Sequence, residues 1–296
     1  TGAIRLDGEL SITGAASGDL SNTVTFGSEP GGVLDLVNSR GAQSGTLQGE
    51  SAAIRLTNSE WTLAGNNSRL GAGSSFTIDA SSRLTAAGSG TLGQAAVSIG
   101  GVLELDASEG TEWNLSNRLS DDGTDAGELV KKGEGMVVLN AENSRTGSTS
   151  IEAGEIRLEH VLGLGTGHIA VETASGVLTL GEKATGEFVN RIANGGTVNV
   201  SGSSLILSGD DSGTGRGNVL SGADVLLSGD NSGFDGENGA LWNVEAGAAV
   251  SITRAANLGE SADVLLNGAL TLRSAVPAEG NVYVWRNALA GSGNLV

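Results

Sequence analysis

Residues 129–158 have the sequence LVKKGEGMVVLNAENSRTGSTSIEAGEIRL. Apolar runs begin at Met136 and Ile156, and glycine, serine and asparagine fill much of the interval between them. Short apolar runs that are closed by such turn-forming residues are typical of β-strands. The stretch therefore predicts strands that recur after about 20 residues.

The same pattern extends in both directions along the chain. Its clearest strands are Ala3–Leu6, Ala53–Leu56, Val102–Leu105, Val177–Leu180, Val198–Val200, Leu205–Leu207 and Leu270–Leu272. Each places alternate side chains on one face. First apolar residues recur about every 21 positions, with an irregular step near Trp113, at Val33, Ile54, Phe76, Val97, Met136, Ile156, Val177, Val198, Val219, Trp242, Val264 and Val282.

A repeat of this length predicts one coil of a solenoid, because a single coil cannot bury its own apolar face. We expect an all-β fold, a right-handed parallel β-helix with three faces and about 14 coils. The pattern of short apolar runs and turn-forming residues does not change from one end of the sequence to the other. Residues 1–296 are therefore expected to form a single β-helical domain.

Composition agrees with many short strands joined by tight turns. The chain has 49 glycines and 2 prolines, and 38% of its residues are hydrophobic, enough to bury a core. It has no cysteine, which excludes disulfides, thiolate metal sites and cysteine nucleophiles.

Charge and hydropathy exclude two classes of partner. The 34 acidic and 16 basic residues give a net charge of -18, which would repel nucleic acid and anionic membranes. No apolar run reaches the roughly 18 residues of a membrane span. The first nine residues lack the charged and apolar regions of a signal peptide. Targeting or anchoring segments are therefore expected outside this sequence.

Residues 129–158 resemble the passenger-associated repeat of bacterial autotransporters. The positions that match this repeat, within one residue, are Lys131, Gly133, Gly135, Leu139, Asn143, Gly147, Thr149, Ile151, Gly154, Ile156 and Leu158. Met136 and Val138 stand where the family usually has leucine, and Arg145 replaces its usual aromatic residue. Looser similarity covers 227–236 and 242–248, and 289–296 resembles the start of a further repeat.

The resemblance implies a passenger region displayed or released at the surface of a Gram-negative cell, with a signal peptide before it and a membrane anchor after it. It implies a non-catalytic adhesin for aggregation, biofilm formation or host attachment. Its partner would be the same protein on a neighbouring cell, or a host matrix protein or glycan. The alternatives are the stem of a toxin or protease whose active head lies elsewhere, and a polysaccharide-degrading β-helix enzyme.

Stacked Asn, Thr and Asp side chains on one face would suit self-association, since each hydrogen bond contributes about 1 kcal/mol. The residues best able to anchor a glycan or protein are Trp61, Trp113, Trp242, Tyr283 and Trp285. Each lies in a predicted strand, so a role in the core or at an end of the solenoid is the favoured interpretation.

Four motifs carry possible chemistry, and for each a turn or loop is the favoured interpretation. Residues 209–213 and 229–233 are similar to the surroundings of a serine nucleophile but carry an extra residue before the serine. His160 and His168 offer nitrogen ligands to a metal. Asp121, Asp122 and Asp125 offer oxygen ligands to calcium.

The fourth motif is glycine-rich. Residues 133–135 and 163–168 have the glycine density of a phosphate-binding loop but lack its lysine–serine pair and a following helix. We therefore predict no catalytic, metal-binding or cofactor-binding residues and no cofactor. The residues that bind a partner are not identified by the sequence.

Overall fold

The computed structural model describes residues 2–14, 17–28, 31–88, 91–123, 125–235, 239–259, 261–273 and 285–296. The chain forms two compact units. Unit 1 comprises Thr1–Val137 and Ala141–Thr149, and unit 2 comprises Val138–Asn140 and Ser150–Val296.

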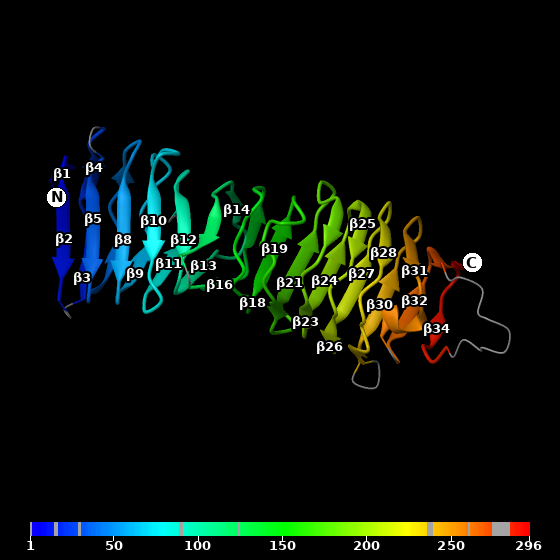
Figure 1. Cartoon of the computed structure of the whole chain (residues 1–296). Coiled ribbons are helices and arrows are strands. Elements are labelled where there is room, and N and C mark those ends of the chain that lie inside the picture. The colour runs from blue at the N-terminus through cyan, green and yellow to red at the C-terminus, as the bar shows by residue number, and fades with distance from the viewer. Residues whose placement is uncertain are drawn as a thin grey trace. The chain divides into compact units, whose positions relative to one another are not determined.

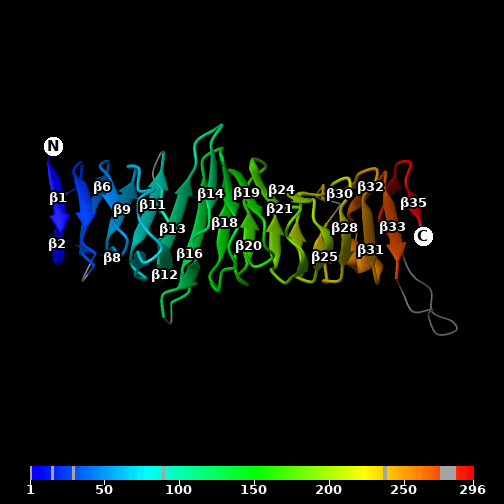
Figure 2. The same ribbon diagram turned by 90° about the horizontal axis from the view of Figure 1, so that it is seen from above.

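Both units are right-handed parallel β-solenoids, as the sequence predicts. Figures 1 and 2 show the strands of successive turns side by side within each unit. The described residues form about 13 turns, close to the expected 14. Apart from the short 3₁₀ helix η2 (Ala255–Leu258), the described elements are strands.

Three faces alternate along the chain in unit 1. The first contains β1 (Ala3–Leu6), β4 (Thr23–Phe26) and β7 (Leu47–Gln48). The second contains β2 (Glu9–Thr13), β5 (Val33–Val37), β8 (Ala53–Thr57), β10 (Ser75–Ile78), β12 (Ala96–Ile99) and β15 (Leu119–Asp121). The third contains β3 (Ser17–Asp19), β6 (Arg40–Gln43), β9 (Glu60–Leu63), β11 (Arg83–Ala87), β13 (Val102–Asp106) and β16 (Glu128–Lys132).

Three further strands complete this region of the sequence. They are β14 (Glu112–Leu115), β17 (Met136–Leu139) and β18 (Thr149–Ile151). The last two lie where the chain passes between the units, since Val138–Asn140 belongs to unit 2 and Ala141–Thr149 to unit 1.

Unit 2 also has three faces. One contains β19 (Gly154–Leu158), β21 (Gly176–Leu180), β24 (Thr197–Val200), β27 (Arg216–Val219), β30 (Leu241–Val244), β32 (Asp263–Leu266) and β34 (Leu289–Ala290). The next contains β22 (Gly186–Phe188), β25 (Ser203–Leu207), β28 (Asp224–Leu227), β31 (Ala249–Ile252), β33 (Ala269–Leu272) and β35 (Asn294–Leu295). The last contains β20 (Ile169–Val171), β23 (Ile192–Asn194), β26 (Ser212–Gly213) and β29 (Gly233–Phe234).

The core consists of inward side chains stacked from turn to turn. In unit 1, Leu34, Ile54, Phe76, Val97 and Leu119 lie opposite one another and are at most 2% exposed. The repeat interval was predicted, but Leu34 and not Val33 is the core residue of its strand. The next core residue after Val97 is Leu119 and not Trp113. This pairing explains why the predicted repeat has an irregular step near Trp113.

In unit 2, the predicted core positions also differ from the observed core stack by one or two residues. Its members are Ile156, Leu178, Val198, Gly217, Trp242 and Val264. Leu289 of β34 pairs with Val264 at the end of this row and is exposed. The predicted Val177 is one residue away from the stack, and Val219 pairs with Val244 two positions along. Val282 lies outside the described residues.

Buried polar side chains close the corners between faces. In unit 1, the Ser59 backbone N–H donates to Ser82 Oγ at 3.0 Å, and the Ser39 N–H donates to Ser59 Oγ at 3.0 Å. In unit 2, Asn190 Nδ2 donates to the carbonyls of Gly165 and Gly167. These bonds satisfy backbone groups that strands cannot pair where the chain turns.

Arg145 occupies a fully buried position in the repeat motif, at 0% exposure. Its guanidinium donates to Gly127 O, Ser148 O and Thr149 Oγ1 at 2.6–2.9 Å. Burial lowers its pKa to about 10, so the side chain remains charged at neutral pH. Arg145 therefore places a hydrogen-bonded cation inside unit 1.

Candidate functional site: a polar ladder on unit 2

A row of polar side chains runs across the outward sides of β21, β24, β27 and β30, where it is buried at Thr179 of β21 and partly exposed on the other three strands. Thr179, Asn199, Asn218 and Asn243 occupy equivalent positions on these strands and lie directly opposite one another. Because side chains alternate along a strand, this row faces away from the core stack that includes Val198 and Trp242. We call these four residues the polar ladder.

Side-chain hydrogen bonds join successive members of the polar ladder. Asn218 Nδ2 donates to Asn199 Oδ1 at 2.9 Å, and Asn243 Nδ2 donates to Asn218 Oδ1 at 3.5 Å. Asn199 Nδ2 donates to Thr179 Oγ1 at 3.4 Å. Each amide has two N–H donors and an oxygen with two lone pairs, so these bonds use only part of its capacity. The three asparagines are partly exposed and can make further hydrogen bonds.

A pocket of about 510 Å³ lies at one end of the ladder. Its charged lining residues come from β19 and from the turns after β19 and β21, and both signs are present. They are Glu155, Arg157, Glu159, Glu182 and Lys183. Arg157 Nε donates to Glu155 Oε1 at 3.3 Å, which fixes one ion pair at the rim. The surface therefore combines amide hydrogen-bonding groups with mixed charge.

The sequence predicted stacked polar side chains on one face of the solenoid, but it did not identify the residues of the polar ladder. The spacing of Asn199, Asn218 and Asn243 by about one coil is the sequence signal for it, since residues one coil apart become neighbours. Glu182 and Lys183 were missed, because they lie in a turn whose conformation the repeat does not determine.

Two of the tryptophans that were considered as possible binding residues belong to the core. Trp61 is 5% exposed and its Nε1 donates to Ser39 Oγ at 3.0 Å. Trp242 is 4% exposed, its Nε1 donates to Leu258 O at 3.0 Å, and its ring lies 5.5 Å from that of Phe234. The favoured core role is thus confirmed for both residues.

The other aromatic candidates differ. Trp285 is partly exposed and donates from Nε1 to Asn287 O at 2.9 Å. Trp113 is also partly exposed and lies in β14 beside a second pocket. Tyr283 lies outside the described residues.

Both serine segments include a solenoid corner, as predicted, and each ends in a short strand, β26 or β29. The Asp211 N–H donates to Asn231 Oδ1 at 2.8 Å, so the two segments are equivalent positions in successive turns. Asp211 Oδ1 accepts from the Ile192 N–H at 3.2 Å, which is the bond that an asparagine makes at such a corner. Burial, with a further contribution from Asp210, raises the pKa of Asp211 to about 7.

The candidate metal ligands do not converge. His160 Nδ1 accepts the Leu162 N–H within a turn, and Asp121 accepts hydrogen bonds from the Thr146 N–H and Oγ1 and from the Gly147 N–H. Asp122 and Asp125 pair through their backbones. Within the described residues, no three His, Cys, Asp or Glu side chains are grouped so that they could hold a metal ion.

Comparison with models of known protein families, with curated proteins and with solved structures gives no match to this chain. Among the described residues, no helix is long and apolar enough to cross a membrane.

Proposed function

We propose that the chain is an autotransporter adhesin passenger, displayed at the surface of a Gram-negative cell, which associates with another copy of itself through the polar ladder. The observation that carries this proposal is the row of asparagine amides on β24, β27 and β30. These amides are hydrogen-bonded to one another and still have unused donor and acceptor capacity. The resemblance of residues 129–158 to the passenger-associated repeat and the parallel solenoid fold support the family and location.

The ladder surface is self-complementary in its chemistry. An asparagine amide both donates and accepts, so the same row can face its own copy in a two-fold interface. The neighbouring pocket offers Arg157 and Lys183 to the glutamates of a second copy. Single contacts of this kind are weak, at about 1 kcal/mol each, and repetition along many displayed copies would give useful adhesion.

The proposal is tested with non-adherent bacteria that display the whole chain. These cells are mixed with differently labelled cells that display nothing, and the composition of the clumps is measured by microscopy. Self-association predicts clumps made of displaying cells only. Clumps that recruit both labels would contradict it and favour another ligand, and absence of clumping would favour the structural stem.

A ladder variant makes the test specific. Asn218→Lys places a charge at the centre of the ladder, and in a two-fold interface this charge faces a second copy of itself. Asn294→Lys is the matched control, because Asn294 is an exposed residue of β35, which lies on a different face of unit 2 from the ladder strands. Clumping should be lost in the first variant and kept in the second. Equal clumping by both variants would remove the ladder from the proposal.

A further inference from the structure

A polar pocket lies on the first face of unit 1, on the outward side of β4 and β7. Its volume is about 390 Å³. All of its lining side chains are polar and none of them is buried, so a ligand from solvent can reach each one. They are Thr23, Thr46, Gln48, Asn66, Ser68 and Arg69. We call this site the arginine pocket.

A chain of hydrogen bonds positions Arg69 at the arginine pocket. The bridge between Gly49 and Leu70 places Arg69 after Thr25 and Gln48 in one outward row. Gln48 Nε2 donates to Thr25 Oγ1 at 2.8 Å, and Arg69 Nη1 donates to Gln48 Oε1 at 3.4 Å. A guanidinium carries several N–H donors in a planar fork, and this bond uses only one of them. The remaining donors of Arg69 are available to a ligand.

Arg69 makes no ion pair with any residue that the structure describes. Arg5, at the other end of the same row, is paired with Asp7 at 2.7 Å. Glu50, which follows β7, places its carboxylate against Gly71 and does not line the pocket. No other Asp or Glu lines it, although the chain has 34 acidic and only 16 basic residues. A basic pocket without carboxylates in so acidic a chain indicates an anionic ligand.

The other groups at the arginine pocket can also donate hydrogen bonds. Asn66 Oδ1 accepts the Ser68 N–H at 3.0 Å, which leaves Asn66 Nδ2 as the free end of the amide. The hydroxyls of Thr23, Thr46 and Ser68 make no hydrogen bond to a described residue. Donors arranged around a cation match a ligand that has many oxygen acceptors.

We propose that the arginine pocket binds one acidic sugar ring, with the sugar's carboxylate on Arg69 and its other oxygens on Asn66 Nδ2 and the threonine hydroxyls. The planar guanidinium matches a carboxylate in bidentate geometry. Ligand pockets have volumes of roughly 300–1,000 Å³, and this pocket is near the lower end, which favours a single ring. The net charge of -18 repels a long acidic polymer, which favours a terminal sugar with one charge.

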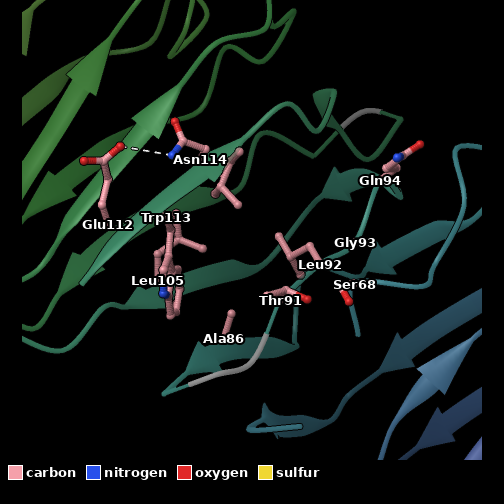
Figure 3. A pocket seen from close by; sticks show the side chains of 11 residues that line it. Ser68, Ala86, Thr91, Leu92, Gly93, Gln94, Leu105, Glu112, Trp113 and Asn114 are labelled. Atoms are coloured by element: carbon pink, nitrogen blue, oxygen red, sulfur yellow. Dashed lines mark hydrogen bonds between the residues drawn. The ribbon is translucent and has the colours of Figure 1, made fainter. Parts of the chain in front are cut away.

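The neighbouring pocket beside Trp113 has a different chemistry. Ser68 contributes to both pockets, and Figure 3 shows it with Trp113 and Glu112 in the second one. That pocket includes the carboxylate of Glu112 and no Lys or Arg, so it does not offer a site for an anion. The proposed carboxylate contact is therefore specific to the arginine pocket.

This site goes beyond self-association through unit 2, and its test uses the purified full chain. Saturation-transfer NMR measures binding of glucuronate, galacturonate and N-acetylneuraminate. Methyl glucoside is the ring without a carboxylate, and acetate is the carboxylate without a ring. At least one sugar acid should bind saturably at millimolar concentration, and both comparison compounds should bind about tenfold more weakly. Failure of all three sugar acids, or equal binding of either comparison compound, would overturn the proposal.

Arg69→Gln removes the charge at the pocket and should weaken binding of the sugar acid about tenfold or more. Arg118→Gln is the matched control, because it makes the same charge change at an exposed position of unit 1 outside the pocket lining, and it should leave binding unchanged. Thr23→Val keeps the shape of the side chain, removes one hydroxyl and should weaken binding about two- to fivefold. Equal affinity of Arg69→Gln and Arg118→Gln would overturn the assignment of the carboxylate to Arg69.

Clumping of displaying cells separates this proposal from the proposed function. Arg69→Gln should leave clumping unchanged, because the polar ladder belongs to unit 2. Loss of clumping in Arg69→Gln, together with no binding of any sugar acid, would place a carboxylate of a second copy in the pocket and overturn the sugar assignment.

Discussion

Gly41 lies directly opposite Trp61 in the next turn, and the missing side chain of the glycine makes room for the indole. A Cβ atom built on Gly41 would lie 3.0 Å from Trp61 Cη2 and 2.5 Å from the carbonyl oxygen of Gly18. Gly217 has the same relationship to Trp242 in unit 2, with 2.5 Å to the ring. Each buried tryptophan is therefore stacked on a glycine.

Gly41→Ala should lower the free energy of unfolding by about 1–3 kcal/mol, since overpacking a well-filled core costs that much. Gly18→Ala is the matched control, because Gly18 is the partner of Gly41 in the preceding turn and has open space at its Cβ. Urea unfolding of both variants, followed by tryptophan fluorescence, measures the difference. Equal stability of the two variants would contradict the packing argument.

Asp211 should make unit 2 less stable as the pH rises. Its folded pKa of about 7 lies above its ordinary 3.8, so the folded state binds a proton that the unfolded state has already released. Stability is fully present below about pH 4 and is lost as pH rises toward about 7.

Asp211→Asn should remove this loss and raise stability at pH 8 by at least about 1 kcal/mol, because the amide keeps the corner hydrogen bonds without a charge. Asp224→Asn, at an exposed position of β28, is the control. Urea unfolding of all three chains at acidic and alkaline pH measures the slopes. A slope that persists in Asp211→Asn would assign the pH dependence to other groups.

Arg145→Ala should destabilise unit 1 by about 3 kcal/mol or more, because it leaves a cavity and buried carbonyls without their donor. Arg118→Ala, at an exposed position, should change stability by less than about 0.5 kcal/mol. Hydrogen exchange of the amides in β16 reports the local effect. Unchanged protection there would show that the guanidinium bonds contribute little.

Self-association should strengthen with added salt, because two chains of charge -18 repel each other and salt screens that repulsion. Sedimentation velocity of the purified chain across salt concentrations measures it. A steep fall of association with salt would instead indicate that the ion pairs of Arg157 and Lys183 with a second copy dominate.

The fold could be predicted because a parallel solenoid repeats one simple rule. Alternation placed Ala53–Leu56 and Val102–Leu105 in strands, and the interval of about one coil set the strands opposite one another. The prediction for Val33 was wrong because the first apolar residue of a run need not be the core residue. Asp35 lies on the same side of the strand as Val33, so alternation places Leu34 and Leu36 in the core.

The sites were less accessible to prediction. The asparagines of the polar ladder carry a spacing signal, because residues one coil apart become neighbours. The corner role of Asp211 depends on which atoms meet in space. Residue type and spacing do not contain that information.

The pairing of each strand with the one a turn earlier makes a unit modular in length. Val33 pairs with Ala53, and Ala53 pairs with Ser75, so removal of residues 53–74 would bring Ser75 opposite Val33 and Phe76 opposite Leu34. The inward and outward faces of these strands would be unchanged. A gene encoding such a protein can therefore gain or lose whole layers by duplication or deletion, and it can vary the number of exposed contact points without redesigning the core.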